Sequence, residues 1–416
     1  MLMTVHVSPP PPPPLIDDVD ELLAFLGDSE VVARFQRRCG LFLVEDAQRG
    51  ARKARAPSTL GPEKARAQLN GTRDHHQDKN SNYTSKHSGC SVDGTAQYEV
   101  RNWLLHFLFL FSAGLGHEVF YITCVPCIHW NLDPFLCRRL VNIWTLVMYV
   151  GQVMKDVLKL PRPLSPPVVK LEMRVDAEYG LPSTHAMAAI AISFTFLLSA
   201  PSRIQFQFEV GLLIAVTLSS LVCLSRLYTG MHSMLDVVCG ALISVVLICI
   251  TYPYWQTFDR FQLSSRLSPI SALLLALFLS YTYPQLDHYS PTQGDTTTIL
   301  GSWVGCSVGY WVNEQLGQTF EPQEGLPVPL STLTANALAQ GAARFFVGVT
   351  VLLLTRQIAK TVSLRVLYSW YRVPQNDLSA KRRRAIEVPY KFVTYTSVGL
   401  VHSILVSRVF MLLHLL

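Results

Sequence analysis

The sequence predicts an all-α fold, a polytopic bundle of transmembrane helices, from its composition and its apolar segments. Half of its 416 residues are apolar and only 15% are charged, whereas a soluble domain carries about 25% charged residues. A helix needs about 20 mostly apolar residues to cross the hydrocarbon core of a bilayer. Segments of this kind recur along the chain, and the expected spans are 103–124, 138–158, 185–200, 207–226, 232–252, 266–284, 297–313, 338–355 and 391–414.

Composition divides the chain into three parts. Residues 1–100 form a polar, proline-rich tail, residues 101–256 hold the first spans, and residues 257–416 hold further spans with a basic amphipathic segment at 357–371. The net charge is +6, and basic runs such as 381–384 lie beside apolar spans. Such runs favour contact with anionic lipid headgroups. Because no aromatic residues alternate with them, nucleic acid is not an expected partner.

The first hundred residues are expected to hold little fixed structure. The run Pro9–Pro14 is typical of an extended polyproline segment. Residues 17–44 carry apolar side chains at helical spacing, which predicts an amphipathic helix that lies on a membrane or docks on the protein. Residues 47–95 are polar and predict disorder. Glycosylation sequons begin at Asn70 and Asn82, and they have meaning only if this tail is lumenal.

The cysteines indicate free thiols rather than a disulfide framework. There are nine of them, an odd number, and several fall inside apolar spans. Cys124 and Cys127 form a single Cys-x-x-Cys pair. Without a second pair, this spacing does not predict a metal site.

Charged and polar residues gather in three short motifs at the ends of the expected spans. The motifs are Lys155…Arg162-Pro163, Pro182-Ser183-Thr184-His185 and Ser225-Arg226…His232…Asp236. Ionisable groups near a bilayer are costly, and their default interpretation is functional. Together the motifs supply three permanent cations, two histidines and a carboxylate. This set suits the hydrolysis of a phosphate ester without a metal.

The three cations match a phosphate group. Arg162 and Arg226 can each bond two phosphate oxygens with a planar guanidinium, and Lys155 adds a compact point charge. Fixed cations stabilise the charge that spreads over the equatorial oxygens in the transition state of phosphoryl transfer. Pro161 and Pro163 flank Arg162 and stiffen its loop.

The two histidines supply a nucleophile and a proton donor. His232 and Asp236 are four residues apart, so on a helix they would share one face. Asp236 could then accept the proton of one ring nitrogen while the other nitrogen attacks phosphorus. His185 lies at an expected helix start, where it could protonate the leaving alkoxide. Ser183 is the expected cap of that helix, whose free amides would form an anion site.

Each motif also has a simpler interpretation. A lone lysine or arginine beside an apolar span is usually an anchor whose charged end reaches the interface. A histidine in a membrane helix often only satisfies a local hydrogen bond, and a Ser-Thr pair before a helix is often only a cap. Anchors alone do not account for three such motifs at the ends of successive spans. Their conjunction favours the catalytic interpretation.

The order and internal spacing of the motifs resemble the three-part signature of the type 2 phosphatidic acid phosphatase (PAP2) superfamily. Thr184 stands where many members have glycine. This variant, with the flanking segments 165–172 and 178–180, resembles the sphingosine-1-phosphate phosphatase branch. Segments 295–298 and 388–392 lean toward the type 2 members of that branch. The fold that the resemblance implies is a transmembrane helical bundle with a PAP2-type phosphatase core at 101–256.

The resemblance also implies an activity and a role for each motif residue. It implies an integral endoplasmic-reticulum enzyme that removes phosphate from sphingosine 1-phosphate and its dihydro form, without a metal or another cofactor. The position matching His232 forms a phosphohistidine with help from the one matching Asp236, and the position matching His185 acts on the leaving group. The positions that bind phosphate match Lys155, Arg162, Ser183 and Arg226.

Two alternative functions stay open. The motifs bind the phosphate and not the lipid, so a broader lipid phosphatase acting on phosphatidate or lysophosphatidate fits them as well. A lipid or anion transporter that retains a phosphate site would instead place its ions near the middle of spans and use paired broken helices. The motif residues lie at span ends and no internal repeat is visible. Both observations favour chemistry on a lipid headgroup.

The sidedness of the spans is predicted only in part. By the positive-inside rule, Arg138, Arg139 and Arg203 are expected on the cytoplasmic side, which places all three motifs on the lumenal side. The same count of spans leaves the basic stretch 356–384 in the lumen, against the rule. The sides of the two termini therefore stay open, as does the oligomeric state.

Overall fold

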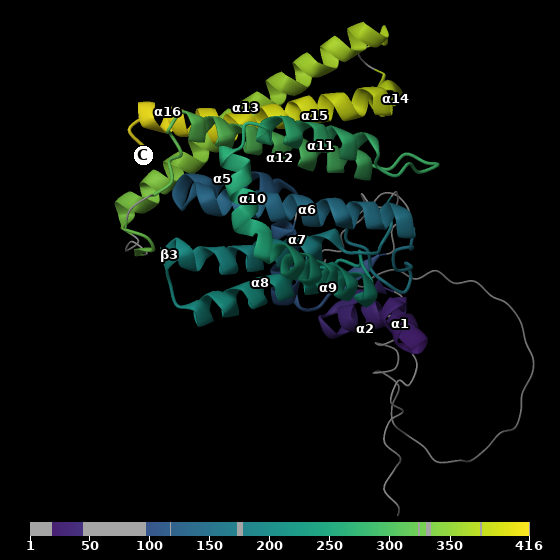
Figure 1. Cartoon of the computed structure of the whole chain (residues 1–416). Coiled ribbons are helices and arrows are strands. Elements are labelled where there is room, and N and C mark those ends of the chain that lie inside the picture. The colour runs from purple at the N-terminus through teal and green to yellow at the C-terminus, as the bar shows by residue number, and fades with distance from the viewer. Residues whose placement is uncertain are drawn as a thin grey trace, which may run out of the picture.

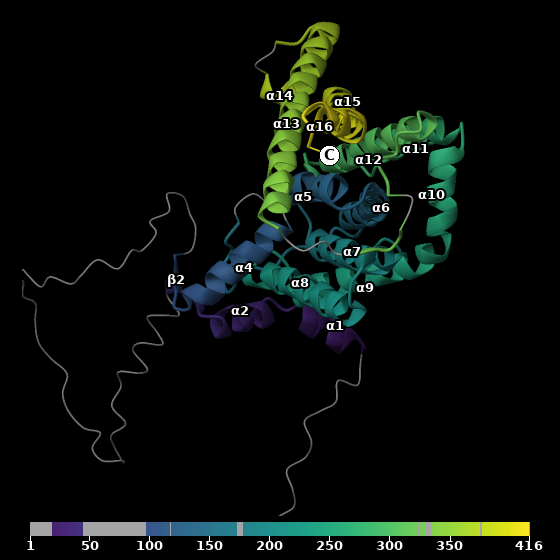
Figure 2. The same ribbon diagram turned by 90° about the vertical axis from the view of Figure 1, so that its left-hand side faces the viewer.

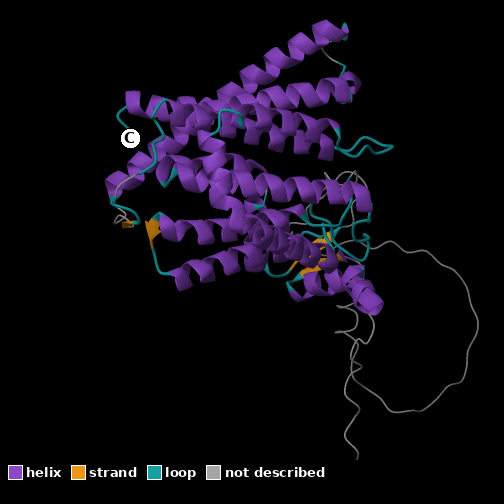
Figure 3. Ribbon diagram, viewed as in Figure 1, coloured by secondary structure: helices purple, strands orange, loops and turns teal. Residues whose placement is uncertain are grey.

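The structure, a computed structural model, describes residues 19–44, 97–116, 118–172, 178–322, 325–329, 334–374 and 377–415. In that part of the chain nearly all regular structure is helical (Figure 3), which confirms the predicted all-α class. The predictions for the proline run, for residues 47–95 and for the sequons at Asn70 and Asn82 lie outside the described residues.

The helices of the membrane part form two groups that follow each other along the chain (Figure 1). The first group is α4 (Trp103–Leu115), α5 (Glu118–Asn131), α6 (Pro134–Leu158), α7 (Thr184–Ser199), α8 (Phe208–Tyr228) and α9 (Met234–Thr251). The second is α10 (Trp255–Ser264), α11 (Ser268–Tyr281), α12 (Thr292–Gln315), α13 (Ala335–Tyr371), α14 (Leu378–Lys381), α15 (Arg384–Leu400) and α16 (Val406–Leu412). Figure 2 shows α10 connecting α9 of the first group to α11 of the second.

The remaining elements are short. Single-turn 3-10 helices follow α7 and α9: η1 (Ala200–Ser202) and η2 (Tyr252–Tyr254). A π-helical turn, η3 (Val401–Leu405), joins α15 to α16. The strands form two pairs, antiparallel β1 (Leu41–Leu43) with β2 (Tyr98–Val100) and parallel β3 (Ile204–Gln205) with β4 (Val328–Pro329).

Five helices of the described part are long and apolar enough to cross a membrane. They are Thr184–Ser202, Phe208–Tyr228, Met234–Ser264, Ala335–Tyr371 and Arg384–Leu412. The chain is therefore a multi-pass membrane protein. Helices α6 and α12, of 25 and 24 residues, also have the length of a span but carry more polar side chains. They lie at the centre, where neighbouring helices bury most of their residues.

Two of the expected elements differ in the structure. The span expected at 103–124 is divided into α4 and α5, because α4 already ends at Leu115 with Gly116 as its C-cap. The basic amphipathic segment 357–371, expected to be distinct from the span at 338–355, is instead the last part of α13. No glycine or proline interrupts the chain between Val349 and Tyr371, so nothing in the local sequence ends the helix there.

The predicted amphipathic helix docks on the protein. It forms two short helices, α1 (Val19–Gly27) and α2 (Ser29–Arg38). The buried face of α2 packs against residues from α7, α8 and α9. Its Gln36 side chain donates to the carbonyls of Val169 and Tyr228, at 2.8 and 2.9 Å, and accepts from the Val169 amide at 2.9 Å. These bonds tie the N-terminal segment to the loop before α7 and to the end of α8.

Candidate active site

The three sequence motifs meet at one end of the α6–α9 group, to the right in Figure 1. Helices α6 and α8 end there, whereas α7 and α9 begin there. The predicted site residues lie on these helix ends and on the segments between them: Lys155 in α6, Arg162 in the next loop, Ser183 and His185 at the start of α7, Arg226 in α8, His232 before α9 and Asp236 in its first turn.

Direct contacts tie the motifs to one another. Lys155 Nζ donates to Thr184 Oγ1 at 3.2 Å, which links the first motif to the second. The Ser183 amide donates to the carbonyl of Asp236 at 3.0 Å, which links the second to the third. The structure therefore brings the motifs into one site.

Arg162 is fixed by backbone carbonyls. Its Nη1 donates to the carbonyl of Met231 at 2.8 Å, and its Nε donates to the carbonyl of Glu178 at 3.0 Å. Its side chain is mostly buried. A guanidinium held at two of its nitrogens keeps a fixed orientation, which a bidentate contact with phosphate requires.

Two glutamates form ion pairs with the cations of the site. Glu178 Oε2 lies 3.5 Å from Lys155 Nζ and 3.3 Å from Arg162 Nη2. Glu172 accepts from both Nη atoms of Arg226, at 3.1 and 3.3 Å. An arriving phosphate therefore competes with carboxylates for these cations. The sequence interpretation missed this role, and the signal that could have revealed it is an acidic residue between two cationic motifs.

His232 and Asp236 are brought together by a turn and not, as the spacing predicted, by one face of a helix. His232 precedes α9, Ser233 is its N-cap, and Asp236 is the third helical residue. Asp236 Oδ2 accepts from the Ser233 amide at 2.8 Å and lies 3.4 Å from His232 Nδ1. This capping box fixes the carboxylate beside Nδ1. The other nitrogen, Nε2, is the one that can attack.

Three buried polar atoms of the site have no hydrogen-bond partner in the described part of the chain: Ser183 Oγ, Arg226 Nε and His232 Nδ1. His232 Nδ1 lies beside the Asp236 carboxylate, so Ser183 Oγ and Arg226 Nε are the two atoms that indicate a site for a polar ligand, because buried polar atoms are nearly always paired. Ser183 does occupy the N-cap of α7, but its hydroxyl does not cap the helix as predicted. It is fully buried and can donate to an anion held at the start of α7.

His185 lies in the first turn of α7, half-buried, against the end of α4. A Cβ on Gly116 would lie 2.7 Å from His185 Cδ2, so this close approach requires glycine. Gly180 is similar, because its Cβ would lie 3.1 Å from Asp236 Oδ2. The two glycines let the loops close tightly around the catalytic candidates.

Burial and neighbouring cations keep the imidazole of His232 neutral. Burial lowers the pKa of His232 well below its usual range, and the positive charges of Arg162, Arg226 and Lys155 lower this pKa further. His185 acts in the same direction, which places it within electrostatic reach of His232. A neutral imidazole has the lone pair that nucleophilic attack on phosphorus requires.

The lowered pKa of His232 predicts the acid limb of the pH profile. His232 loses its nucleophilic form only below its pKa, so the rate of phosphoenzyme formation should fall only well below pH ~6.5, the usual value for histidine. The rate is measured by quenched labelling across pH and corrected for the second ionisation of the substrate phosphate, at about pH 6.

A charge-removing variant tests the cause of this shift. Lys155→Met removes one cation that lowers the pKa, so its acid limb should move to higher pH. A wild-type acid limb at or above pH ~6.5, or no movement in the variant, would contradict this account of His232.

Glu178→Gln should strengthen inhibition by inorganic phosphate. The change removes a negative charge 3.3 to 3.5 Å from two cations of the site. The carboxylate is about one-fifth exposed, so after solvent screening we expect the inhibition constant to fall about 5-fold. Glu99→Gln is the control, because Glu99 forms an exposed ion pair with Arg101 outside the site. An unchanged or weaker inhibition would show that Glu178 does not compete with phosphate.

Known proteins match the chain along most of its length. The family model of the PAP2 superfamily matches residues 137–260. Sphingosine-1-phosphate phosphatase 2 of Homo sapiens is 50% identical over 394 residues, which cover 91% of this chain and 96% of that protein. Its Mus musculus counterpart is 47% identical over 382 residues, covering 91% and 95%. A dihydrosphingosine 1-phosphate phosphatase of Schizosaccharomyces pombe is 31% identical over 276 residues, covering 64% and 65%. No solved structure matches the chain.

Proposed function

The chain belongs to the sphingosine-1-phosphate phosphatase family, and from that premise we propose that it hydrolyses sphingosine 1-phosphate and dihydrosphingosine 1-phosphate to the sphingoid base and phosphate. The single observation that carries the chemistry is the convergence of three cations, two histidines and a carboxylate at the ends of α6 to α9. This set handles a phosphate monoester, which is the reacting group of every lipid phosphate.

The proposed reaction has two steps. In the first, His232 Nε2 attacks phosphorus, and the bond to the sphingoid oxygen breaks as His185 donates its proton to that oxygen. In the second, water attacks the phosphohistidine while the now neutral His185 accepts a proton from it. Phosphate leaves, and both histidines return to their starting states. Asp236, 3.4 Å from His232 Nδ1, stabilises the charge that the ring gains when Nε2 bonds to phosphorus.

The remaining site residues would bind the phosphate. Lys155, Arg162 and Arg226 supply positive charge to its oxygens, and the unpartnered hydroxyl of Ser183 adds a neutral donor. Before the substrate arrives, backbone carbonyls fix Arg162, whereas side chains hold the other two cations: Thr184 and Glu178 contact Lys155, and Glu172 contacts Arg226. Little reorganisation is therefore needed in the transition state, and no metal ion is required to neutralise the phosphate.

The test is release of phosphate from sphingosine 1-phosphate by membranes that contain the chain, with a chelator present. We expect release that Arg226→Ala abolishes, because this change removes a buried guanidinium of the site. No release from any lipid phosphate would refute the proposed function. Release that stops with the chelator and returns with added Mg²⁺ would refute the metal-free mechanism.

Competition among lipid phosphates decides the substrate class. Detergent-dispersed sphingosine 1-phosphate, phosphatidate and lysophosphatidate are offered together at equal concentration. We expect the sphingoid phosphates to be hydrolysed first, in line with the names of the similar proteins. Equal rates would remove the sphingoid assignment and leave a broader lipid phosphatase.

We propose an endoplasmic-reticulum location with the active site on the lumenal side. Arg138, Arg139 and Arg203 lie at the end of the bundle opposite the site, which supports this orientation under the positive-inside rule. Asp259 and Asp133 form ion pairs with Arg139 and Arg203 at 2.7 and 2.5 Å. Labelling of a cysteine introduced at exposed Asp287, before and after permeabilisation of the membrane, would determine the side.

A further inference from the structure

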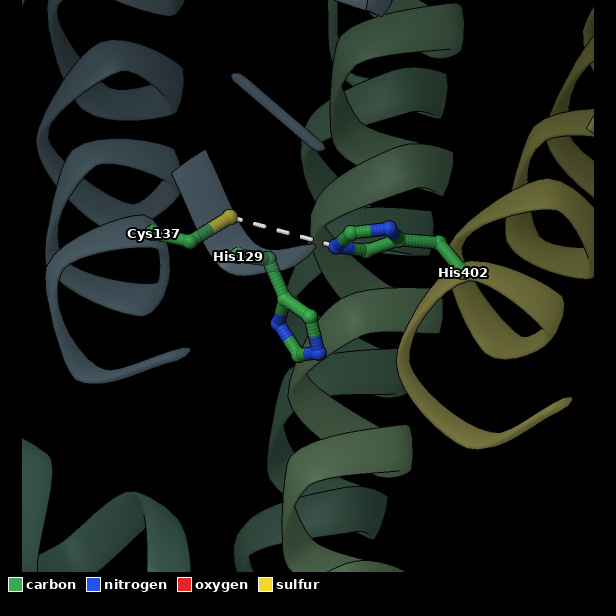
Figure 4. Close-up of side chains that lie close together, drawn as sticks. All are labelled: His129, Cys137 and His402. Atoms are coloured by element: carbon green, nitrogen blue, oxygen red, sulfur yellow. Dashed lines mark hydrogen bonds between the residues drawn. The ribbon is translucent and has the colours of Figure 1, made fainter. Parts of the chain in front are cut away.

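A second cluster of reactive side chains lies at the other end of the first helix group. His129, Cys137 and His402 are all buried, with exposed fractions of 5%, 0% and 3%. Their ligand-type atoms all lie within 4.8 Å of one another, and no other group of this kind is found among the described residues. Figure 4 shows Cys137 and His402 facing each other, with the ring of His129 beside them, and the three side chains come from different helices. The proposed phosphatase reaction uses none of them.

Two members of the cluster, His129 and Cys137, lie on either side of the short turn that joins α5 to α6. His129 is in the last turn of α5 and Cys137 in the first turn of α6, which Asp133 caps by accepting from the Phe135 amide at 2.7 Å. The Cys137 thiol also contacts the carbonyl of Val125 at 3.4 Å. The position of this pair is therefore set by local structure.

The third member arrives from a distant part of the chain through close helix packing. His402 lies in the π-helical turn η3, and α15 with η3 packs on a row of glycines on α12. A Cβ on Gly305 would overlap the backbone of α15, and one on Gly309 would overlap the Ser403 side chain. Small residues at this spacing let membrane helices approach closely. This approach brings His402 Nε2 to 3.9 Å from Cys137 Sγ.

In the described part of the chain, both ring nitrogens of His129 have hydrogen-bond partners, whereas one ring nitrogen of His402 has none. His129 contacts the Tyr310 hydroxyl through Nδ1 at 2.9 Å and Ser407 Oγ through Nε2 at 3.3 Å. His402 Nδ1 has no hydrogen-bond partner in the described part of the chain. Among the described residues, the long contact with Cys137 is thus the one polar contact of this buried ring. The nitrogen that faces Cys137 is Nε2, and its 3.9 Å contact is longer than an ordinary hydrogen bond, so this nitrogen is free to bind a ligand between the two side chains.

Space and charge around the cluster permit a cation. A cavity of about 100 Å³ borders both Cys137 and His402. The nearby guanidinium of Arg138 is paired with Glu321 and lies 3.9 Å from Asp259. Because these carboxylates offset the guanidinium, its charge does not exclude a metal ion from the cluster.

We propose that His129, Cys137 and His402 form a structural Zn²⁺ site, in which one ring nitrogen of His129 exchanges its hydrogen bond to Tyr310 or Ser407 for a bond to the metal. Zinc prefers tetrahedral sets of imidazole and thiolate ligands. At Zn–S and Zn–N bond lengths of ~2.3 and ~2.05 Å, sulfur and nitrogen ligands lie about 3.6 Å apart. The observed 3.9 Å between Cys137 and His402 is close to this separation. Binding would release the thiol proton to solvent.

The proposed ion would connect the two helix groups. It would join α5 and α6, which lead toward the phosphatase site, to the α15–α16 segment at the end of the chain. From Cys137 to Lys155 the ion and the phosphate site would be separated by about 27 Å along α6. The ion therefore stabilises the fold and takes no part in phosphate hydrolysis.

The test is metal analysis of the full chain purified in detergent. We expect one zinc ion per chain in the wild type, and a loss of at least about 10-fold in Cys137→Ser and His402→Gln. Cys306→Ser is the matched control, because Cys306 is a buried thiol on the same cavity but outside the cluster, and it should retain zinc. Wild-type protein that holds no zinc after equilibration with micromolar Zn²⁺ would overturn the proposal, as would variants that keep it.

A second measurement uses the wild-type chain, so that it tests the site even if the variants fail to fold. The wild-type chain is equilibrated with Co²⁺, whose visible and near-ultraviolet spectrum reports its ligands. A sulfur-to-cobalt charge-transfer band with the intense visible bands of tetrahedral Co²⁺ supports the site. Octahedral cobalt, absence of the sulfur band, or copper in place of zinc in the purified chain would overturn it.

Discussion

Replacing His232 with alanine is expected to abolish the phosphoenzyme and to slow turnover at least about 10²-fold. His232 is 1% exposed, is held neutral by burial and by three cations, and has Asp236 beside Nδ1. Brief reaction with sphingosine 1-phosphate that carries radioactive phosphate should label the wild-type chain in an acid-labile, base-stable form. The variant should carry no label.

Two further variants make the result specific to the nucleophile. His232→Asn fills most of the same volume, so a loss of label in this variant is not explained by a cavity at a buried position. His288→Ala removes an exposed imidazole from a loop that contacts Tyr179, and it should label like the wild type. If the adduct survives in both His232 variants, another residue is the nucleophile.

His185→Ala is expected to show a dependence on the leaving group. With the lipid substrate, whose alkoxide needs a proton, phosphoenzyme formation should slow by about 10² to 10⁴. With p-nitrophenyl phosphate, whose phenolate leaves without protonation, the phosphoenzyme should form at nearly the wild-type rate. It should then accumulate, because the base that activates water is also lost.

Rapid-quench labelling with both substrates measures this difference. A burst of p-nitrophenol followed by a slow steady state, together with strong labelling, is the expected result for His185→Ala. An equal loss of rate for both substrates would show that His185 positions the phosphate or the fold instead of protonating the leaving group. His288→Ala, which keeps His185, should show the wild-type behaviour with both substrates.

The sequence interpretation named candidate residues that lie together in the structure, and it left their contacts undetermined. Motif spacing named Lys155, Arg162 and Arg226 as cations of one site, and the structure places them together. The same spacing gave the wrong local geometry for His232 and Asp236, because a four-residue interval fits a capped turn as well as a helical face.

Other features of the site had no local signal. Glu178 faces two cations because the loop before α7 folds back over the end of α6. Gln36 binds the same loop from a segment 133 residues away. Partners at such separations depend on how helices pack, which the spacing along one segment does not encode.

By itself the sequence determined the helical membrane fold and the phosphate chemistry of three motifs. Both follow from properties of neighbouring residues: the length of an apolar segment sets whether it can span a bilayer, and residue type sets which groups can bind phosphate. The tertiary structure alone decided which carboxylates hold the cations, and it alone brought His402 to Cys137 across 265 residues. Such long-range contacts depend on the shape complementarity of buried helix faces. The glycines of α12 and the backbone of α15 are an example. This complementarity exists only once the helices are packed.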